Sequence, residues 1–253
     1  MSLFRSRQTF ILSLVLLLGV LSGNHAVQAQ SFLDRLKSVI GLEKKTDQPL
    51  SQSDIAQGLK EALQVATKTV VSTLGKTDGF NTNASIHIPL PPDLKRANSL
   101  LKKIGLGSVG DTLELKLNRA AEAATPKAKA LFLQAIKDMT LDDVVAVYKG
   151  PEDAATQYFR AKMSPQLKIE MQPVISQSLS SVGAINTYDK FISKYKDLPF
   201  VPDIQADLQD FVMDKTLDGI FYYVAKEEAA IRQDPLKQTS YLLQKVFSPN
   251  KQQ

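Results

Sequence analysis

Residues 207–232 read DLQDFVMDKTLDGIFYYVAKEEAAIR and form the most apolar of the amphipathic segments in this chain. The large apolar side chains recur at intervals of three and four residues and cover much of the circumference that a helix would have. A helix that is apolar on most sides is buried on most sides. We therefore predict that this segment is the central helix and that the other elements pack around it.

The neighbouring segments repeat one pattern, in which a capping residue opens an amphipathic run that a glycine or proline ends. The clearest run starts at Ser51 or Ser53 and ends at Gly75. Further helices are predicted to start at Asp93, before Leu113, at Thr125-Pro126, at Thr140 with Asp143, at Pro151, at Ser164-Pro165, near Asn186 and at Ser240. No stretch shows sustained β-branched alternation between hairpin turns. We predict an all-α fold, a single multi-helix domain over residues 51–248.

One segment departs from the helical pattern. Residues 86–92 read IHIPLPP, and their alternation and prolines suit an extended strap rather than a paired central strand. We expect a short strap that packs across helices. After it, the helix that starts at Asp93 should turn Leu94, Ala97, Leu101 and Ile104 inward.

The N-terminus has the three parts of a secretory signal. Arg5 and Arg7 precede an apolar run over residues 10–21, and a polar stretch then ends in the tetrapeptide AVQA at Ala29. An apolar run of about a dozen residues is short for a membrane span of about 20. We expect a signal peptide over residues 1–29, cleavage after Ala29, and a periplasmic or secreted protein without an integral membrane segment. Residues 30–50 should be a flexible segment and residues 249–253 a tail.

Composition narrows the choice of partners and chemistry. The chain has no cysteine, so no disulfide framework is available and stability must come from a packed core. Without Arg5 and Arg7, 29 basic residues stand against 26 acidic ones, a formal charge of +3. Because the two signs are interspersed, we expect no nucleic-acid partner. His87 is the only histidine after the signal, so we expect no histidine-based metal cluster and no cofactor.

Three short motifs resemble enzyme signatures but lack their context. Residues 105–110 match G-x-G-x-x-G, but a predicted helix precedes them where a dinucleotide site needs a strand. Residues 75–77 match only the end of a phosphate-binding loop. Residues 99–102 match the S-x-x-K of penicillin-recognising acyltransferases, but no K-T-G segment accompanies them. We assign no catalytic residue to these motifs.

Carboxylates form a stripe on the predicted central helix. They stand three and four residues apart and consist of Asp203, Asp207, Asp210, Asp214 and Asp218. Like charges at this spacing repel one another and call for a counter-charge. Three interpretations remain open: a solvated helix edge, ion pairs with the helix that carries Lys95, Arg96, Lys102 and Lys103, or calcium, which prefers oxygen ligands.

Two other predicted helices carry polar stripes beside small apolar residues. One consists of Glu114, Asn118 and Glu122, and the other of Asp153, Gln157 and Arg160. In one interpretation the two stripes line a cleft in which Arg119 or Arg160 meets an anionic ligand. In the other, Arg160 and Glu122 form an ion pair that fixes the register of the helices.

Several segments taken together resemble the bacterial domain-of-unknown-function 4197 family. They are GKTDGF at 75–80, IPLP at 88–91, LNRAAEAA at 117–124, DAATQYFR at 153–160, LPF at 198–200 and LDGIF at 217–221. The resemblance runs from about residue 58 to residue 247. It implies an exported, helical bacterial protein and carries no activity with it.

These landmarks coincide with the 75–80 loop and with both polar stripes, so we predict a candidate site where the three segments meet. Its residues are Lys76, Thr77, Asp78, Asn118, Arg119, Glu122, Asp153, Gln157 and Arg160. Such a cluster suits a small anionic or zwitterionic ligand. The alternative is that Gly75 only caps a helix and the next residues form a solvated turn.

The function we expect is binding of a small ligand or an envelope partner without catalysis. One alternative is a periplasmic hydrolase-like enzyme that uses Asp, Glu and Arg from the polar stripes. Another is an assembly factor with an exposed apolar groove.

Overall fold

The computed structural model describes residues 50–140, 142 and 144–248. The predicted signal peptide, its cleavage after Ala29, nearly all of the 30–50 segment and the 249–253 tail lie outside these residues. So does Asp143, the second residue of the predicted cap at Thr140.

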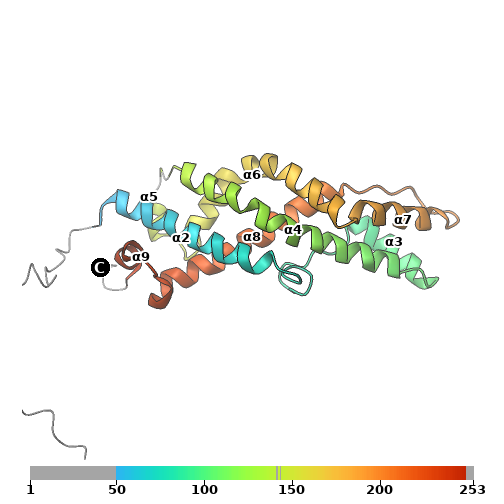
Figure 1. Cartoon of the computed structure of the whole chain (residues 1–253), viewed down its shortest axis with the longest axis horizontal. Helices are drawn as coiled ribbons and strands as arrows, with labels where there is room; N and C mark the ends of the chain where they lie inside the picture. The colour runs from blue at the N-terminus through green and yellow to red at the C-terminus, as the bar shows by residue number, and fades with distance from the viewer. Residues whose placement is uncertain (1–49, 141, 143, 249–253) are drawn as a thin grey trace, which may run out of the picture. The chain divides into compact units, whose positions relative to one another are not determined.

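The described residues fold into helices joined by turns and contain no β-strand, which confirms the all-α prediction. Four long helices, α2 (Gln52–Leu74), α4 (Ser108–Asp138), α6 (Ala154–Ser181) and α8 (Leu208–Gln233), form the body of the bundle (Figure 1). At one end lie the short helices α5 (Val144–Lys149) and α9 (Tyr241–Phe247), and at the other lie α3 (Pro92–Lys103) and α7 (Ala184–Lys196). A 3₁₀ turn, η1 (Pro235–Lys237), joins α8 to α9.

Helix α8 packs against α2, α4, α6 and α9, as expected of a central helix. Its Phe221 meets Phe132 of α4 and Phe159 of α6 in an aromatic cluster, with ring centroids 5.6 to 6.2 Å apart. Edge-on and tilted ring pairs of this kind are favourable because the positive ring edge faces the negative face of its neighbour. The cluster holds three long helices together at the middle of the bundle.

Side chains cap several helix starts, including the predicted starts at Ser51 and Ser240. Ser51 and Asp54 form a reciprocal capping box on α2, with N–H to side-chain oxygen distances of 3.0 and 3.2 Å. The side chains of Asp207 and Ser240 accept N–H donors in the first turns of α8 and α9. A side-chain acceptor at this position satisfies a backbone donor that the helix itself leaves unpaired.

The predicted helix starts at Thr125-Pro126 and Ser164-Pro165 are wrong. Pro126 lies inside α4, and Pro165 and Pro173 lie inside α6. An interior proline removes one backbone hydrogen bond and costs about 3 kcal/mol. Both helices continue because they bury apolar side chains on each side of the proline, such as Ala124 and Ala128 in α4. The tertiary packing outweighs the local cost.

Helix α3 buries Leu94, Ala97 and Leu101 as predicted, but not Ile104. The helix ends at Lys103, and Ile104 projects from the following turn with 54% of its surface exposed. The prediction that Ile104 faces inward is therefore wrong.

None of the helices formed by the described residues combines the length and apolar character needed to cross a membrane.

Candidate functional site

The segment between α2 and α3 is a turn followed by an extended strap, and buried side chains of α4 hold both. Asp78 stands in the left-handed region of the turn at a φ of 67°. In the strap, Ile86, Ile88 and Leu90 are buried while His87 and Pro89 are half-buried, which is the alternation that the sequence predicted.

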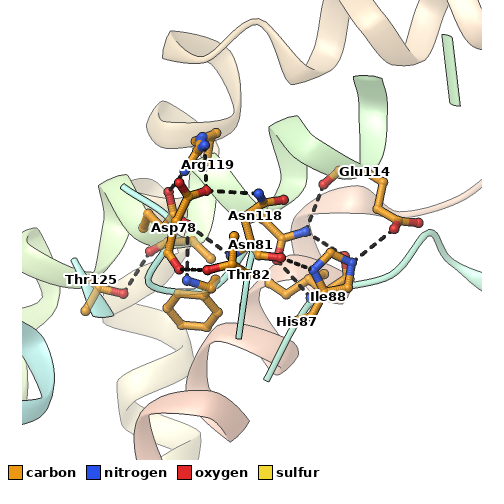
Figure 2. A network of polar contacts seen from close by, with 12 residues as sticks. Asp78, Asn81, Thr82, His87, Ile88, Glu114, Asn118, Arg119 and Thr125 are labelled. Carbon is orange, nitrogen blue, oxygen red and sulfur yellow. Dashed lines mark hydrogen bonds and ion pairs between the residues drawn. The ribbon is translucent and has the colours of Figure 1, made fainter. Parts of the chain in front are cut away.

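The carboxylate of Glu122 is the anchor of the turn. It is almost fully buried, and its Oε1 accepts the backbone N–H groups of Phe80 and Asn81, both at 3.1 Å. Arg119 binds Oε2 of the same carboxylate at 2.6 Å and Oδ1 of Asp78 at 2.8 Å (Figure 2). The guanidinium of Arg119 thus joins the turn to α4 through two ion pairs.

These contacts shift the titration of the paired groups. The Asn81 amide and the Arg119 guanidinium lower the pKa of the Asp78 carboxyl from its ordinary value of 3.8. The hydrogen bond with Glu122 raises the pKa of Arg119 above its ordinary value. At neutral pH Asp78 and Arg119 are therefore charged and pair with each other.

The side-chain amide of Asn118 binds the backbone of the strap. It pairs with both the N–H and the C=O of one residue, as a neighbouring β-strand would. Asn118 Oδ1 accepts the N–H of Ile88 at 2.9 Å, and its Nδ2 donates to the carbonyl of Ile88 at 2.8 Å (Figure 2). Nδ2 also donates to the carbonyl of Glu114 at 2.9 Å. A buried backbone segment outside helices needs such partners, because unpaired N–H and C=O groups are costly away from water.

His87 ties the strap to the turn and to α4. Its Nδ1 lies 2.8 Å from the carbonyl oxygen of Asn81, and its Nε2 lies 3.0 Å from Oε1 of Glu114. The other oxygen of Glu114 accepts the N–H of Leu90 at 3.0 Å. Both ring nitrogens face oxygens that only accept, so both hydrogen bonds form together when each nitrogen carries a hydrogen. We call the residues Asp78, Asn81, His87, Glu114, Asn118, Arg119 and Glu122 the strap network.

A cavity of about 530 Å³ is bounded by the strap, the start of α6 and the middle of α8. We call it the α6–α8 cavity. Its polar lining consists of Ser85, His87, Asp153, Thr156, Gln157, Arg160, Lys215, Asp218 and Tyr222. Its apolar lining consists of Ile86, Gly219, Phe221 and Ala225. The α6–α8 cavity therefore brings together three segments that the sequence analysis singled out. They are the strap, residues 153–160 and residues 217–221.

Opposite charges face each other in the α6–α8 cavity. Arg160 forms an ion pair with Asp218, and both side chains are about half exposed. The guanidinium carbon of Arg160 also lies 5.6 Å from the ring centroid of Phe221. Asp153 accepts a hydrogen bond from Gln157 at 2.7 Å. Two cationic and two anionic side chains line the cavity.

A second hollow of about 540 Å³ shares the lining residues Asp153, Tyr222 and Ala225 with this cavity. Tyr222 stands between the two hollows. Hydrogen bonds with Lys226 and Ser85 lower the pKa of its phenol below the ordinary value. The Lys226 ammonium lies 4.4 Å from the centroid of the same ring.

Glu228 of α8 binds the first residues of α6. The sequence analysis did not identify this residue. Glu228 is fully buried, and its carboxylate accepts the N–H groups of Ala155 at 3.0 Å and Thr156 at 2.7 Å. The Thr156 hydroxyl donates to it at 2.6 Å, and Arg232 pairs with it at 2.7 Å. Free N–H groups at a helix start favour a negative charge. The carboxylate therefore fixes the wall of the cavity that carries Gln157 and Arg160.

The structure divides the predicted site residues between two assemblies. Asp78, Asn118, Arg119 and Glu122 belong to the strap network, and Asp153, Gln157 and Arg160 line the α6–α8 cavity. Lys76 and Thr77 are exposed on the turn, and neither is among the residues that line the cavity. His87 belongs to both assemblies. The alternative ion pair between Arg160 and Glu122 is wrong, because these residues pair with Asp218 and Arg119.

The counter-charges of the carboxylate stripe come from helices other than α3. Lys168 of α6 binds Asp214 at 2.6 Å, Lys196 of α7 binds Asp203 at 3.1 Å, and Arg160 binds Asp218. Arg96 and Lys102 of α3 pair instead with Asp93 and Asp111. Of the three interpretations of the stripe, ion pairing with α3 is therefore wrong. Within residues 50–140, 142 and 144–248, no group of three or more His, Asp or Glu residues is placed to hold a metal ion.

Residues 49–248 match the model of a family described as protein of unknown function (DUF4197). No curated protein and no solved structure matches the chain. The matched range runs from before α2 to the end of α9 and contains both the strap network and the α6–α8 cavity. Because the match covers most of the chain, this protein belongs to the DUF4197 family.

Proposed function

We propose that the protein binds a small zwitterionic or anionic molecule in the α6–α8 cavity and does not transform it. The observation that carries the proposal is a cavity of about 530 Å³ in which two cations, two carboxylates and two aromatic rings converge. Ligand sites in proteins are commonly concavities of about 300–1,000 Å³ with a few converging polar groups.

The charges in the cavity favour a ligand that carries an acidic group. Arg160 and Lys215 both reach the cavity, and Arg160 stays half exposed despite its pair with Asp218. A guanidinium has five N–H donors and binds a carboxylate or phosphate through two of them. Asp153 and Asp218 are available to an ammonium group of the same ligand. Phe221 and Tyr222 add apolar surface for the body of the ligand.

The hydrogen bonds of His87 favour binding over hydrolysis. Ser85, His87 and Asp218 all line the cavity, and these residue types also occur in nucleophilic hydrolases. A base must have a free nitrogen within reach of the serine hydroxyl to take up its proton. Both nitrogens of His87 instead face oxygens of Asn81 and Glu114, at 2.8 and 3.0 Å.

The proposed setting of this activity is the cell envelope. The basic start, the short apolar run and the small residues before Gln30 support export and cleavage after Ala29. Mass spectrometry of the protein recovered from an envelope fraction tests this part. A mature form that begins at Gln30 is expected, and an intact chain confined to membranes would contradict it.

The binding proposal is tested with the chain from Gln30 onward. Native mass spectrometry of protein taken from envelope extract identifies any small molecule that it retains, and calorimetry with amino acids, dicarboxylates and phosphate esters measures affinity. A ligand of the proposed class should bind about 10 to 100 times more weakly to Arg160→Gln and Lys215→Gln, because each loses a charged hydrogen bond. Lys162→Gln is the matched control, since Lys162 of α6 is exposed and lies over Tyr158 outside the cavity lining. Equal affinity in all three variants would rule out this site.

A further inference from the structure

The turn after α3 forms an exposed tip that combines apolar and basic side chains. Leu101 is buried, whereas all five residues over 102–106 are exposed. Ile104 and Leu106 expose 54% and 40% of their surface, and Leu100, one helical turn earlier, exposes 39%. Large apolar side chains grouped on a surface are typical of a site that meets a partner or a membrane.

Backbone hydrogen bonds fix the tip rather than leaving it as a free loop. Gly105 stands in the left-handed region at a φ of 78°. The N–H of Gly105 donates to the carbonyl of Lys102 at 3.2 Å, and the N–H of Leu106 donates to that of Leu101 at 2.9 Å. This is the Schellman arrangement, which folds the residue after the glycine back over the last turn of the helix. Leu106 is therefore held on the same end of α3 as Leu100 and Ile104.

The charges around the apolar tip are mostly positive. Residues 92–111 contain Lys95, Arg96, Lys102 and Lys103 against two acids, Asp93 and Asp111. The ion pair with Asp111 at 2.8 Å raises the pKa of Lys102, so this ammonium stays charged. Lys95 and Lys103 are exposed on the surface of α3. A surface that fits the tip must therefore offer an apolar layer together with negative charge.

A bilayer with anionic phospholipids offers both at once. Its headgroups are negative, and the boundary between headgroups and acyl chains accepts apolar side chains to a depth of about 5–10 Å. Exposed lysines next to such a surface strengthen the attraction. We propose that the α3 tip docks on an anionic phospholipid surface, with Ile104 and Leu106 at the acyl boundary and Lys103 against the phosphates. This interaction is separate from ligand binding in the α6–α8 cavity.

Vesicle co-sedimentation tests the proposal with the chain from Gln30 onward, because an uncleaved apolar leader would itself bind lipid. The chain should bind phosphatidylglycerol–phosphatidylcholine vesicles, bind pure phosphatidylcholine weakly, and dissociate at high salt. The double variant Ile104→Asp with Leu106→Asp should lose about tenfold or more in partitioning. Lys103→Gln should lose about fivefold on the anionic vesicles.

The matched controls are Ile169→Asp on α6 and Leu236→Asp on η1, which replace side chains exposed by 72% and 89%. Circular dichroism checks that every variant is folded, which is expected because all these positions are exposed. The proposal is overturned if the chain does not bind anionic vesicles, or if the tip variant binds them as well as the Ile169 control does. The α3 tip could instead bind a second copy of the chain, and light scattering without vesicles detects such a dimer. A dimer that the tip variant abolishes would also overturn the lipid assignment.

Discussion

Replacing Glu228 with alanine should be among the most destabilising single changes in the described part of this protein. The carboxylate is fully buried and accepts hydrogen bonds from Ala155, from both donors of Thr156, and from Arg232. The guanidinium of Arg232 is itself only 9% exposed. Glu228→Ala therefore leaves a buried cation without its partner and the start of α6 without its acceptor.

The expected loss follows from what is left unpaired. Removing one member of a buried ion pair costs about 3–5 kcal/mol, because the remaining charge cannot return to water. Arg232 also donates to the carbonyl of Tyr148 at 3.1 Å, which partly satisfies it and argues for the lower half of this range. For a domain of this size, each kcal/mol lowers the melting temperature by about 2–4 °C. The variant should therefore melt roughly 6–16 °C below the wild type.

Urea and thermal unfolding followed by circular dichroism measure this loss. Glu227→Ala is the matched control, because Glu227 is the adjacent residue and pairs with Lys237 at 2.8 Å in a partly exposed ion pair. Such pairs contribute about 0–1 kcal/mol. If Glu228→Ala and Glu227→Ala unfold at the same urea concentration, the assignment of Glu228 as the buried anchor of α6 is refuted.

Three further changes test the strap and its network. Asn118→Leu should lower the free energy of unfolding by roughly 2–4 kcal/mol in urea, since the N–H and C=O of Ile88 lose their partner, and an unchanged midpoint would contradict this account. Gly219→Ala should cost about 1–3 kcal/mol, because the new Cβ would lie 2.8 Å from Phe80 Cε1, and a melting temperature like that of the wild type would show that the strap can shift freely. Asp78→Asn tests pH dependence: the folded pKa of Asp78 is lowered, so its carboxylate stabilises the fold at neutral pH and this stabilisation is lost as pH falls below about 4. Urea midpoints of wild type and Asp78→Asn should therefore differ at pH 7, and the difference should shrink as pH falls below about 4. A difference that stays constant as pH falls would count against the ion pair.

The elements that the sequence predicted correctly are those whose determinants lie close together in the chain. The apolar spacing of residues 207–232 and the caps at Ser51 and Ser240 are local features, and each appears in the structure as expected. The helix starts predicted at Pro126 and Pro165 are wrong because the determinants of these helices lie far apart in the chain. The cost of Pro126 is local, whereas the burial that offsets it depends on neighbouring helices.

Glu228 shows which part of a site a sequence can reveal. It follows Leu217, Phe221 and Val224 at helical spacing, so it lies on the buried stripe of α8, and an acid on such a stripe is a detectable signal. Its partner Ala155 is 73 residues away, and nothing in the spacing of either helix predicts that contact. The same limit applies to the carboxylate stripe, because its spacing does not indicate that the paired cations lie on α6 and α7.

The strap network and the α6–α8 cavity are connected through the strap itself. Asn118 and Glu114 bind its backbone and His87, while Ser85 and His87 border the cavity. The opposite wall, which carries Arg160, is held by Glu228 through the first turn of α6. Both walls are thus fixed by buried carboxylate or amide groups with two or more backbone partners. Because an ordered site loses little entropy when a ligand enters, this arrangement supports the proposed binding of a small ligand through few contacts.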